Sequence, residues 1–489
     1  MITTLSALLL LSGCHRDKGT DGSNNQDDTG EEEVDTTPPE PEPLNVVGWE
    51  DDVGVALESG VQQGEPHAIA LPSGRLFASW METLSTGNKL YVTMTHSDDG
   101  GETWSEPYYV DEDRVGWQND PVFAYAGGKL LYTWLAVESY DASKSTIYCV
   151  ESDDDGDTWS DKVALSPSGD FVDRQWIATQ GDRVVMTWDA FPTNYTTEMV
   201  YTESTTGCSG FSELKTIADG VFLNGVPAID ANGDVWVARD SFGRSKVSYI
   251  VSKLTGDTLE DYTIQTYEYP DGAYYTMFLE HEEEEERPGE EIERFYPGIF
   301  SSTAMAEARL NLHLRPDVAP VKVARGTFDG SYSPVLTALP DGGLGVITLA
   351  TDAEDSNYAD VFFTTVGEDG TSSEPMVVHQ DDAGGNPQME PWLISDAAGG
   401  LHTIWYDGRE GEWRLYSAHS LDGGETWTEL QAGDHTFTRG FDENTAADFN
   451  AWVGHFQALV ATDDAVVAVF GSSHDDGISR IYAAKSKTE

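Results

Sequence analysis

Residues 97–104 read Ser-Asp-Asp-Gly-Gly-Glu-Thr-Trp, and the pattern Ser-x-Asp-x-Gly-x-Thr-Trp recurs at 152–159 and 420–427. Degenerate copies lie at 204–211 and 252–259. An Asp in a tight turn accepts hydrogen bonds from nearby backbone amides, and Gly permits positive φ. The pattern therefore predicts a recurring β-hairpin whose defined residues are structural. These residues are Ser97, Asp99, Gly101, Trp104, Ser152, Asp154, Gly156, Trp159, Ser420, Asp422, Gly424 and Trp427.

A longer repeat contains these hairpins. It consists of a short apolar strand, a Gly turn and a strand that ends in an aromatic residue, and it is clearest at 65–80 and 120–134. Weaker copies begin near Arg174, Val226, Ser333, Glu390 and Gly454. Repeated units of about four short strands are typical of propeller blades. We expect an all-β propeller of four-stranded blades, with seven blades favoured over six, and with strand material at 46–57 closing the ring.

The hairpin pattern resembles the Asp box of the sialidase (BNR-repeat) families, and this resemblance covers the fold of residues 46–489. In those families the box lies on the outer rim, away from the central funnel, and the fold has six blades. The fourth and fifth repeat starts of this chain are 107 residues apart, about twice the usual step. We expect an acidic insertion at 268–326, and a diverged extra blade is the alternative.

The resemblance implies a sialidase site only in part. A sialidase holds the substrate carboxylate with three arginines and uses a Tyr nucleophile with an acidic proton donor. Here Gly64 stands where the first arginine is expected, and Glu65 follows it. Residues 330–336 are similar to the strand that carries the nucleophile, which would be Tyr332. We expect no sialidase activity, and a sialidase-like exo-acting glycoside hydrolase is the alternative, with Tyr332, Asp120 and Asp173 as catalytic residues.

The inner ends of the first strands of the repeats give the candidate ligand site, in which acidic residues predominate. The ligand-binding candidates are Glu65, His67, Asn119, Arg174, Asn224 and Glu390, beside the catalytic candidates Asp120, Asp173 and Tyr332. Such a funnel suits a neutral or basic sugar, a peptide or a Ca²⁺-bridged ligand. We expect a binding protein for a glycan or a surface protein, monomeric, with Ca²⁺ as the only candidate cofactor. A purely structural surface protein is a third hypothesis.

The charge of the chain excludes two classes of partner. Lys and Arg number 27 against 87 Asp and Glu, which gives a net charge of −60. This charge repels nucleic acid and anionic membrane surfaces. We therefore expect no nucleic-acid partner, and contact with a membrane only through a lipid anchor.

The N-terminus predicts that anchor. Residues 5–11 are mostly apolar but too few to span a bilayer. Leu11-Ser12-Gly13-Cys14 follows and resembles the bacterial lipobox, although no Lys or Arg precedes it. We expect a signal peptide at 1–13, lipidation of Cys14, and an acidic, Pro-rich, disordered tether at 14–45. His15 favours the outer membrane and cell surface; a short buried helix ending in a core cysteine is the alternative to this interpretation.

Two further cysteines, Cys149 and Cys208, would be exported with the domain, where a disulfide is chemically permitted. Sequence does not fix the geometry that a bridge needs. We expect two separate buried thiols, with a disulfide as the alternative.

Overall fold

The computed structural model describes most of the chain from residue 42 onward, and all described residues lie in the unit Pro41–Glu489. The described ranges are 42–57, 61–83, 90–111, 117–137, 144–166, 171–193, 196–220, 225–242, 246–268, 334–340, 342–350, 360–381, 386–438 and 453–489. The predicted signal peptide with Cys14, nearly all of the 268–326 insertion, Asn224 and Tyr332 lie outside them.

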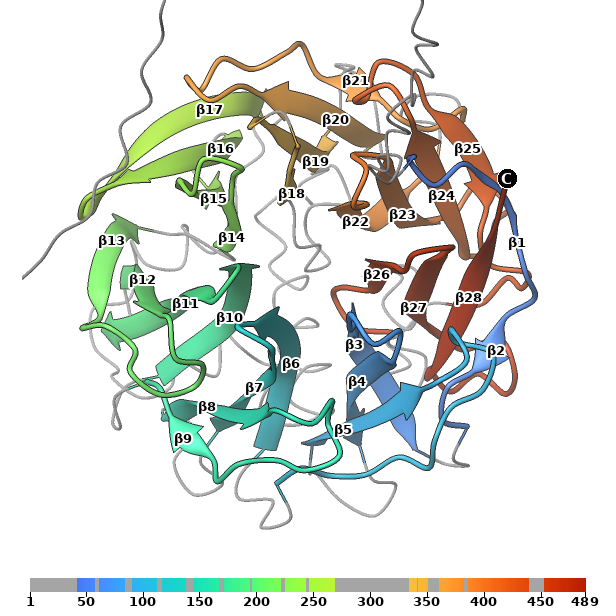
Figure 1. The fold of residues 1–489 in the computed structure, drawn as a ribbon. Helices are drawn as coiled ribbons and strands as arrows, with labels where there is room; N and C mark the ends of the chain where they lie inside the picture. Colours follow the sequence, from blue (N-terminus) through green and yellow to red (C-terminus); the bar gives the residue numbers. More distant parts are fainter. Residues whose placement is uncertain are drawn as a thin grey trace, which may run out of the picture. The chain divides into compact units, whose positions relative to one another are not determined.

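Seven antiparallel sheets follow one another along the chain and form the blades of a propeller (Figure 1). Blade 1 consists of β3 (Gln62–Ala70), β4 (Leu76–Thr83) and β5 (Leu90–Ser97). Blade 2 consists of β6 (Trp117–Ala126), β7 (Lys129–Val137), β8 (Ser145–Ser152) and β9 (Val163–Ala164). Blade 3 consists of β10 (Phe171–Gln180), β11 (Arg183–Thr193), β12 (Thr196–Ser204) and β13 (Lys215–Gly220). Blade 4 consists of β14 (Val226–Ile229), β15 (Val235–Phe242), β16 (Lys246–Thr255) and β17 (Thr258–Glu268).

The remaining three blades complete the ring. Blade 5 consists of β18 (Val335–Ala338), β19 (Leu344–Ala350), β20 (Asp360–Val366) and β21 (Met376–Val377). Blade 6 consists of β22 (Gln388–Ser395), β23 (Leu401–Asp407), β24 (Arg414–Ser420) and β25 (Thr428–Gln431). Blade 7 consists of β26 (Ala458–Ala461), β27 (Val466–Ser472) and β28 (Arg480–Thr488), joined by β1 (Val46–Trp49) and β2 (Val53–Gly54).

The ring is closed by the two ends of the chain. Both β1 and β2 pair with β28, so the N-terminal strands complete the last blade. The innermost strands contact one another in the order β3, β6, β10, β14, β18, β22 and β26, and β26 contacts β3 again. The prediction of seven blades is thus confirmed. Blade 1 has three strands in its sheet, and an isolated bridge between Met94 and Tyr108 takes the place of the fourth.

The core lies between the blades. Seven hydrophobic clusters each combine the facing sides of two neighbouring sheets, because each strand sends alternate side chains to opposite faces. Five tryptophans of the second strands are fully buried in these clusters or beside them. They are Trp80, Trp134, Trp188, Trp236 and Trp405. Within the described residues, no helix is long and apolar enough to cross a membrane.

The three Asp boxes share one hydrogen-bond pattern. In the box of blade 2 the Ser152 hydroxyl donates to Asp154 at 2.7 Å, and it accepts from the Gly156 amide at 2.8 Å. Asp154 in turn accepts from the Thr158 amide at 2.8 Å. The boxes of blades 1 and 6 repeat these bonds within 0.1 Å. In each box the serine is buried and the aspartate is exposed.

Each box Trp packs against the preceding blade. Trp159 of blade 2 meets the Phe77 ring of blade 1 at 6.4 Å between centroids, and Trp427 of blade 6 meets Phe363 of blade 5 at 5.0 Å. Trp104 of blade 1 packs against the hydrophobic cluster that blade 1 shares with blade 7. The boxes therefore join blades as well as turning the chain.

Cys149 and Cys208 form a disulfide, so the expectation of two separate thiols is wrong. Cys149 lies in β8, and Cys208 lies in the degenerate box that follows β12. Cys208 occupies the fifth position of that box, where the three full boxes have Gly. The bridge thus ties the degenerate hairpin of blade 3 to β8 of blade 2.

Candidate active or binding site at the propeller centre

The innermost strands of four blades carry a β-bulge at the same place. The register shifts between Gly64 and His67 in β3, and the same shift occurs in β6, β10 and β22. One residue in each bulge has left-handed backbone geometry. These residues are Glu65 (φ 54°), Asp120 (φ 51°), Arg174 (φ 58°) and Glu390 (φ 54°). Such geometry costs about 1–3 kcal/mol for a residue with a side chain and is concentrated at functional sites.

Glu65, Asp120 and Asp173 form a row of hydrogen-bonded carboxyl groups, which we call the carboxyl row. Asp120 is in the middle and bonds to Glu65 on one side and to Asp173 on the other. Glu65 and Asp173 are buried, while Asp120 is half-buried. The row joins three blades at the centre of the ring, where β3, β6 and β10 are neighbours (Figure 1).

A histidine and an arginine flank the row. His455 Nδ1 lies 2.8 Å from Glu65 Oε1, and Arg174 Nε lies 3.7 Å from Asp173 Oδ2. Arg174 also acts on Asp240, a buried carboxyl of β15. The group therefore combines four carboxyls with one guanidinium and one imidazole.

Burial holds these carboxyls in their protonated form. It raises the pKa of Glu65 to about 8, against the opposing charge of Arg174. It raises the pKa of Asp120 to about 7, with a further contribution from the Glu65 charge. Burial likewise places the pKa values of Asp173 and Asp240 well above the usual range. Carboxyls that share hydrogen bonds retain protons between them, so the row holds protons near neutral pH.

An aromatic layer is formed by residues further along the innermost strands that carry the row. Its residues lie two positions after the left-handed residues in the sequence. The Trp176 ring contacts the Trp392 ring at 5.2 Å and the Phe456 ring at 5.4 Å between centroids. His67 lies 6.3 Å from Trp176, and burial lowers its pKa to about 4, so this ring is neutral. Val122 and Val226 belong to the same cluster. The layer thus joins five of the seven innermost strands with the segment just before β26.

Two glutamine side-chain amides donate hydrogen bonds to the backbone carbonyl oxygens of left-handed residues. Gln175 Nε2 donates to the carbonyl oxygen of Asp120, and Gln457 Nε2 donates to that of Glu390 at 2.7 Å. Each glutamine comes from the next blade, so the bulges are held across blade boundaries. Sequence reasoning missed both glutamines, together with His455 and Asp240. His455 and Gln175 had a signal, because each follows a repeat start, at Gly454 and Arg174.

The structure brings together four of the predicted site residues: Glu65, Asp120, Asp173 and Arg174. The others lie nearby or beyond the described chain. His67 belongs to the aromatic layer, Asn119 is buried before the bulge of β6, and Glu390 is buried in the bulge of β22. Asn224 and Tyr332 are outside the described residues, so their predicted roles stay predictions.

The arginines of the described ranges do not form a carboxylate clamp. Arg174 is the one whose charge acts on the carboxyl row. The others pair with acids elsewhere: Arg75, Arg183, Arg239, Arg409, Arg414 and Arg480. The three-arginine clamp of a sialidase is therefore absent from the part of the chain that the structure describes.

Comparisons with known proteins give likenesses of fold. No family model matches the chain, and no curated protein matches it. Among solved structures, the GH93 alpha-L-arabinofuranosidase of Fusarium graminearum is 12% identical, with 90% of this chain and 98% of that chain covered and a TM-score of 0.47. A Dyadobacter fermentans protein of unknown function is 11% identical, with 91% and 100% covered and a TM-score of 0.46.

A leech intramolecular trans-sialidase is 11% identical, with 80% of this chain and 70% of that chain covered and a TM-score of 0.42. Likenesses this distant carry no argument about activity. The chain's own seven sheets and three Asp boxes identify it as a seven-bladed Asp-box β-propeller, similar in fold to sialidase-like and GH93 proteins.

Proposed function

We propose that the protein binds a glycan at the centre of the propeller, that this glycan is neutral or bears an amine, and that the protein is no sialidase. The observation that carries the proposal is the carboxyl row of Glu65, Asp120 and Asp173, opposed by the single charge of Arg174. An anionic sugar would lack an arginine clamp, and its charge would oppose the loss of the row's protons. An ammonium group would instead favour the loss of those protons and pair with the resulting carboxylates.

Half-buried rings beside the row support a sugar as the ligand. Trp392 and His67 are half-buried, and both belong to the layer that contacts Trp176. Aromatic faces together with a few convergent polar groups are typical of small-ligand sites. The carboxyls and Arg174 offer acceptors and donors for hydroxyl groups, while the rings offer an apolar face to the sugar.

Hydrolysis at the same place is the second candidate function. It is favoured by Asp120, which is half-buried and has a pKa of about 7, near the value that suits a general acid at neutral pH. Directly hydrogen-bonded carboxyls are closer than the roughly 5–9.5 Å that glycosidase pairs span. A hydrolase would therefore need its second group from outside the row, for which Tyr332 is the predicted nucleophile.

The test is titration of the purified protein with three oligosaccharides of different charge. These are a chitosan oligosaccharide with free amines, its N-acetylated neutral form, and sialyllactose. We expect affinity to fall in that order. Asp120→Asn should weaken binding of the amine form by about tenfold or more, equivalent to ~1.4 kcal/mol. Asp154→Asn, at the exposed rim box, is the matched control and should bind as the wild type does.

Two results would decide against the proposal. Tightest binding of sialyllactose, or an Asp120→Asn variant that binds as the wild type does, would contradict a site at the row. Turnover of a neutral fluorogenic glycoside that Asp120→Asn abolishes would favour the second candidate. Turnover of a sialoside would show that arginines beyond the described residues complete a clamp.

A further inference from the structure

A second group of acids lies at the seam where the N-terminal strands close the ring. Asp52 lies between β1 and β2, while Asp434 and His435 follow β25 of blade 6. One ligand atom from each of these three side chains lies within 4.8 Å of the other two. Among the described residues, no other acid or histidine group of three or more meets this spacing.

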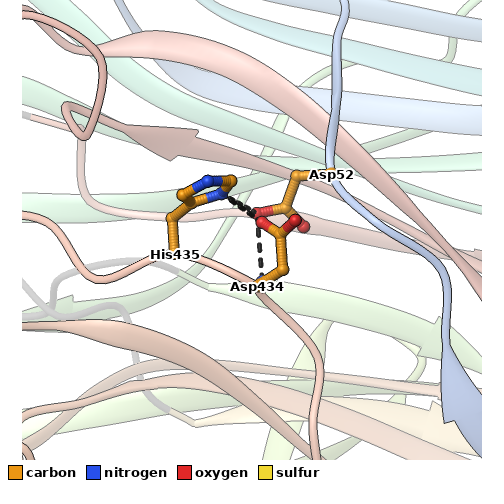
Figure 2. A group of neighbouring side chains, drawn as sticks. All are labelled: Asp52, Asp434 and His435. Carbon is orange, nitrogen blue, oxygen red and sulfur yellow. Dashed lines mark hydrogen bonds and ion pairs between the residues drawn. The ribbon is translucent and has the colours of Figure 1, made fainter.

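The three side chains converge on one point (Figure 2). The Asp434 amide donates to Asp52 Oδ2 at 3.2 Å, which fixes the two segments against each other. His435 Nδ1 lies 3.8 Å from the same oxygen and contacts Asp434 Oδ1. The two carboxyls and the imidazole nitrogen thus face a common centre.

Asp52 supplies an independent sign of a ligand. Its side chain is only 2% exposed, and its Oδ1 has no hydrogen-bond partner. A buried polar atom without a partner costs roughly 1–3 kcal/mol, and a carboxylate costs more. The positive charge of Arg414 acts on Asp52, but its guanidinium pairs with Glu410 at 2.8 Å. A cation bound by the Asp52 carboxyl would give this oxygen a partner.

The imidazole is held in place from blade 7. The His474 ring stacks on His435 with centroids 4.2 Å apart and planes 4° from parallel. His474 is itself fixed by Ser472, whose hydroxyl lies 2.9 Å from its Nδ1. His474 is thus a positioning residue for His435 rather than a member of the converging group.

We propose that Asp52, Asp434 and His435 bind a zinc ion that fastens the N-terminal strands to blade 6. Two carboxylates and an imidazole suit zinc, whereas calcium and magnesium prefer oxygen ligands throughout. Zinc bonds of about 2.0–2.2 Å would hold the ligand atoms roughly 3.5 Å apart, so the His435 ring would move off Asp434 to admit the ion. Half of the His435 side chain is exposed, at 52%, which leaves a path for the ion and for a water as fourth ligand.

The function of this site is stabilisation of ring closure. Asp52 lies between the two strands that pair with β28, so an ion that holds Asp52 also holds the seam. The net charge of −60 raises the local concentration of cations around the molecule. This proposal does not depend on the glycan site.

The experiment is calorimetric titration of the chelator-treated full chain with zinc, calcium and magnesium separately, followed by thermal unfolding. We expect one zinc equivalent, weak or no binding of the other two ions, and a higher Tm with zinc. At free zinc a hundredfold above Kd, the folded-to-unfolded ratio should rise about 100-fold. Asp434→Asn and His435→Ala lie in an exposed loop, so they should fold but lose the zinc equivalent and the rise in Tm.

Two controls separate this site from others. His96→Ala removes a histidine from another partly exposed pair, with Asp98 at 3.9 Å, and should leave zinc binding intact. Asp173→Asn alters the carboxyl row and should also leave it intact. The proposal is overturned if the wild type binds no zinc, if both loop variants keep the equivalent, or if Asp173→Asn loses it. Calcium binding that His435→Ala does not change would overturn the assignment to zinc.

Discussion

The rim and the centre of this propeller use the same residue type in opposite ways. At the rim, Asp99 and Asp154 are exposed and accept hydrogen bonds from threonines, which lower their pKa values to about 2. At the centre, burial raises the pKa of Asp120 to about 7 and that of Glu65 to about 8. The rim carboxylates are anchors for a turn, whereas the central carboxyls hold protons that a ligand can exchange or displace.

The backbone shows the same contrast. The fourth position of the box is left-handed and is Gly100 or Gly423 in two boxes, with Asp155 in the third. Glycine adopts that geometry without strain. The left-handed positions of the innermost strands carry Glu65 and Arg174 among others, so strain is kept there together with a charged side chain. The difference separates a part of the fold that avoids backbone strain from the part where we propose that a ligand binds.

The largest expected effect is at the rim, at Gly156. A Cβ there would overlap the Phe77 ring of blade 1, and φ is +84°. Gly156→Ala should therefore lower the free energy of unfolding by about 2–5 kcal/mol, from left-handed strain plus overpacking. Urea unfolding measures it. Gly128→Ala is the control, since its φ is +79° but nothing lies within 4 Å of the added Cβ. If the two variants lose the same free energy of unfolding, the box does not hold neighbouring blades together.

A smaller loss is expected from the disulfide. Cys149 and Cys208 are 59 residues apart in sequence, so the bridge shortens the unfolded chain considerably. The Cys149→Ala/Cys208→Ala variant should lose about 2–4 kcal/mol of unfolding free energy and keep its glycan affinity. Chemical denaturation with a parallel binding assay tests both parts. Loss of binding at unchanged stability would remove the distinction between a rim that stabilises and a centre that binds.

The smallest effect per step is a dependence of stability on pH, of at most about 1.4 kcal/mol for each pH unit and with opposite signs at the two places. The folded-state pKa of Glu65, about 8, is above its ordinary 4.5, so the folded protein holds a proton that the unfolded chain has lost. Its contribution is complete below the ordinary value and is lost as pH rises towards 8, by up to about 1.4 kcal/mol per pH unit. Glu65→Gln should flatten this alkaline slope in a series of unfolding curves.

The rim aspartates act in the other direction. The pKa of Asp154 is lowered from 3.8 to about 2, so its contribution is present above 3.8 and is lost as pH falls towards 2. Asp154→Asn should flatten the acid slope only. If the unfolding free energy of Glu65→Gln still falls with rising pH as in the wild type, the protons are held by groups other than the carboxyl row.

The rim could be predicted from the sequence because its determinants are local. Ser152, Asp154 and Gly156 act within one eight-residue hairpin, and the repeat spacing then gave the number of blades. The disulfide could not be predicted, since the distance between Cys149 and Cys208 depends on how blades 2 and 3 pack. The exposure of Asp154 could not be predicted either, because the pattern shows which atoms bond but not which of them water reaches.

The sequence indicated which residues lie at the centre but not how they are arranged there. Glu65, Asp120 and Asp173 were recognised from their place before the innermost strands. Their hydrogen-bonded row arises because bulges of three different blades meet, which no single repeat encodes. Asp240 was missed for the same reason, as it comes from the second strand of blade 4 and reaches Arg174 only through the closed ring.

The central claim is that the carboxyl row holds protons near neutral pH, and infrared titration of the protonated-carboxyl band tests it most directly. Between about pH 5 and about pH 9 the wild type should lose band intensity at the raised pKa values. Asp120→Asn and Glu65→Gln should each remove part of that change, while Asp154→Asn should leave it intact. A band that is absent in the wild type above about pH 5, or that Asp154→Asn diminishes as much as Asp120→Asn does, would contradict the account.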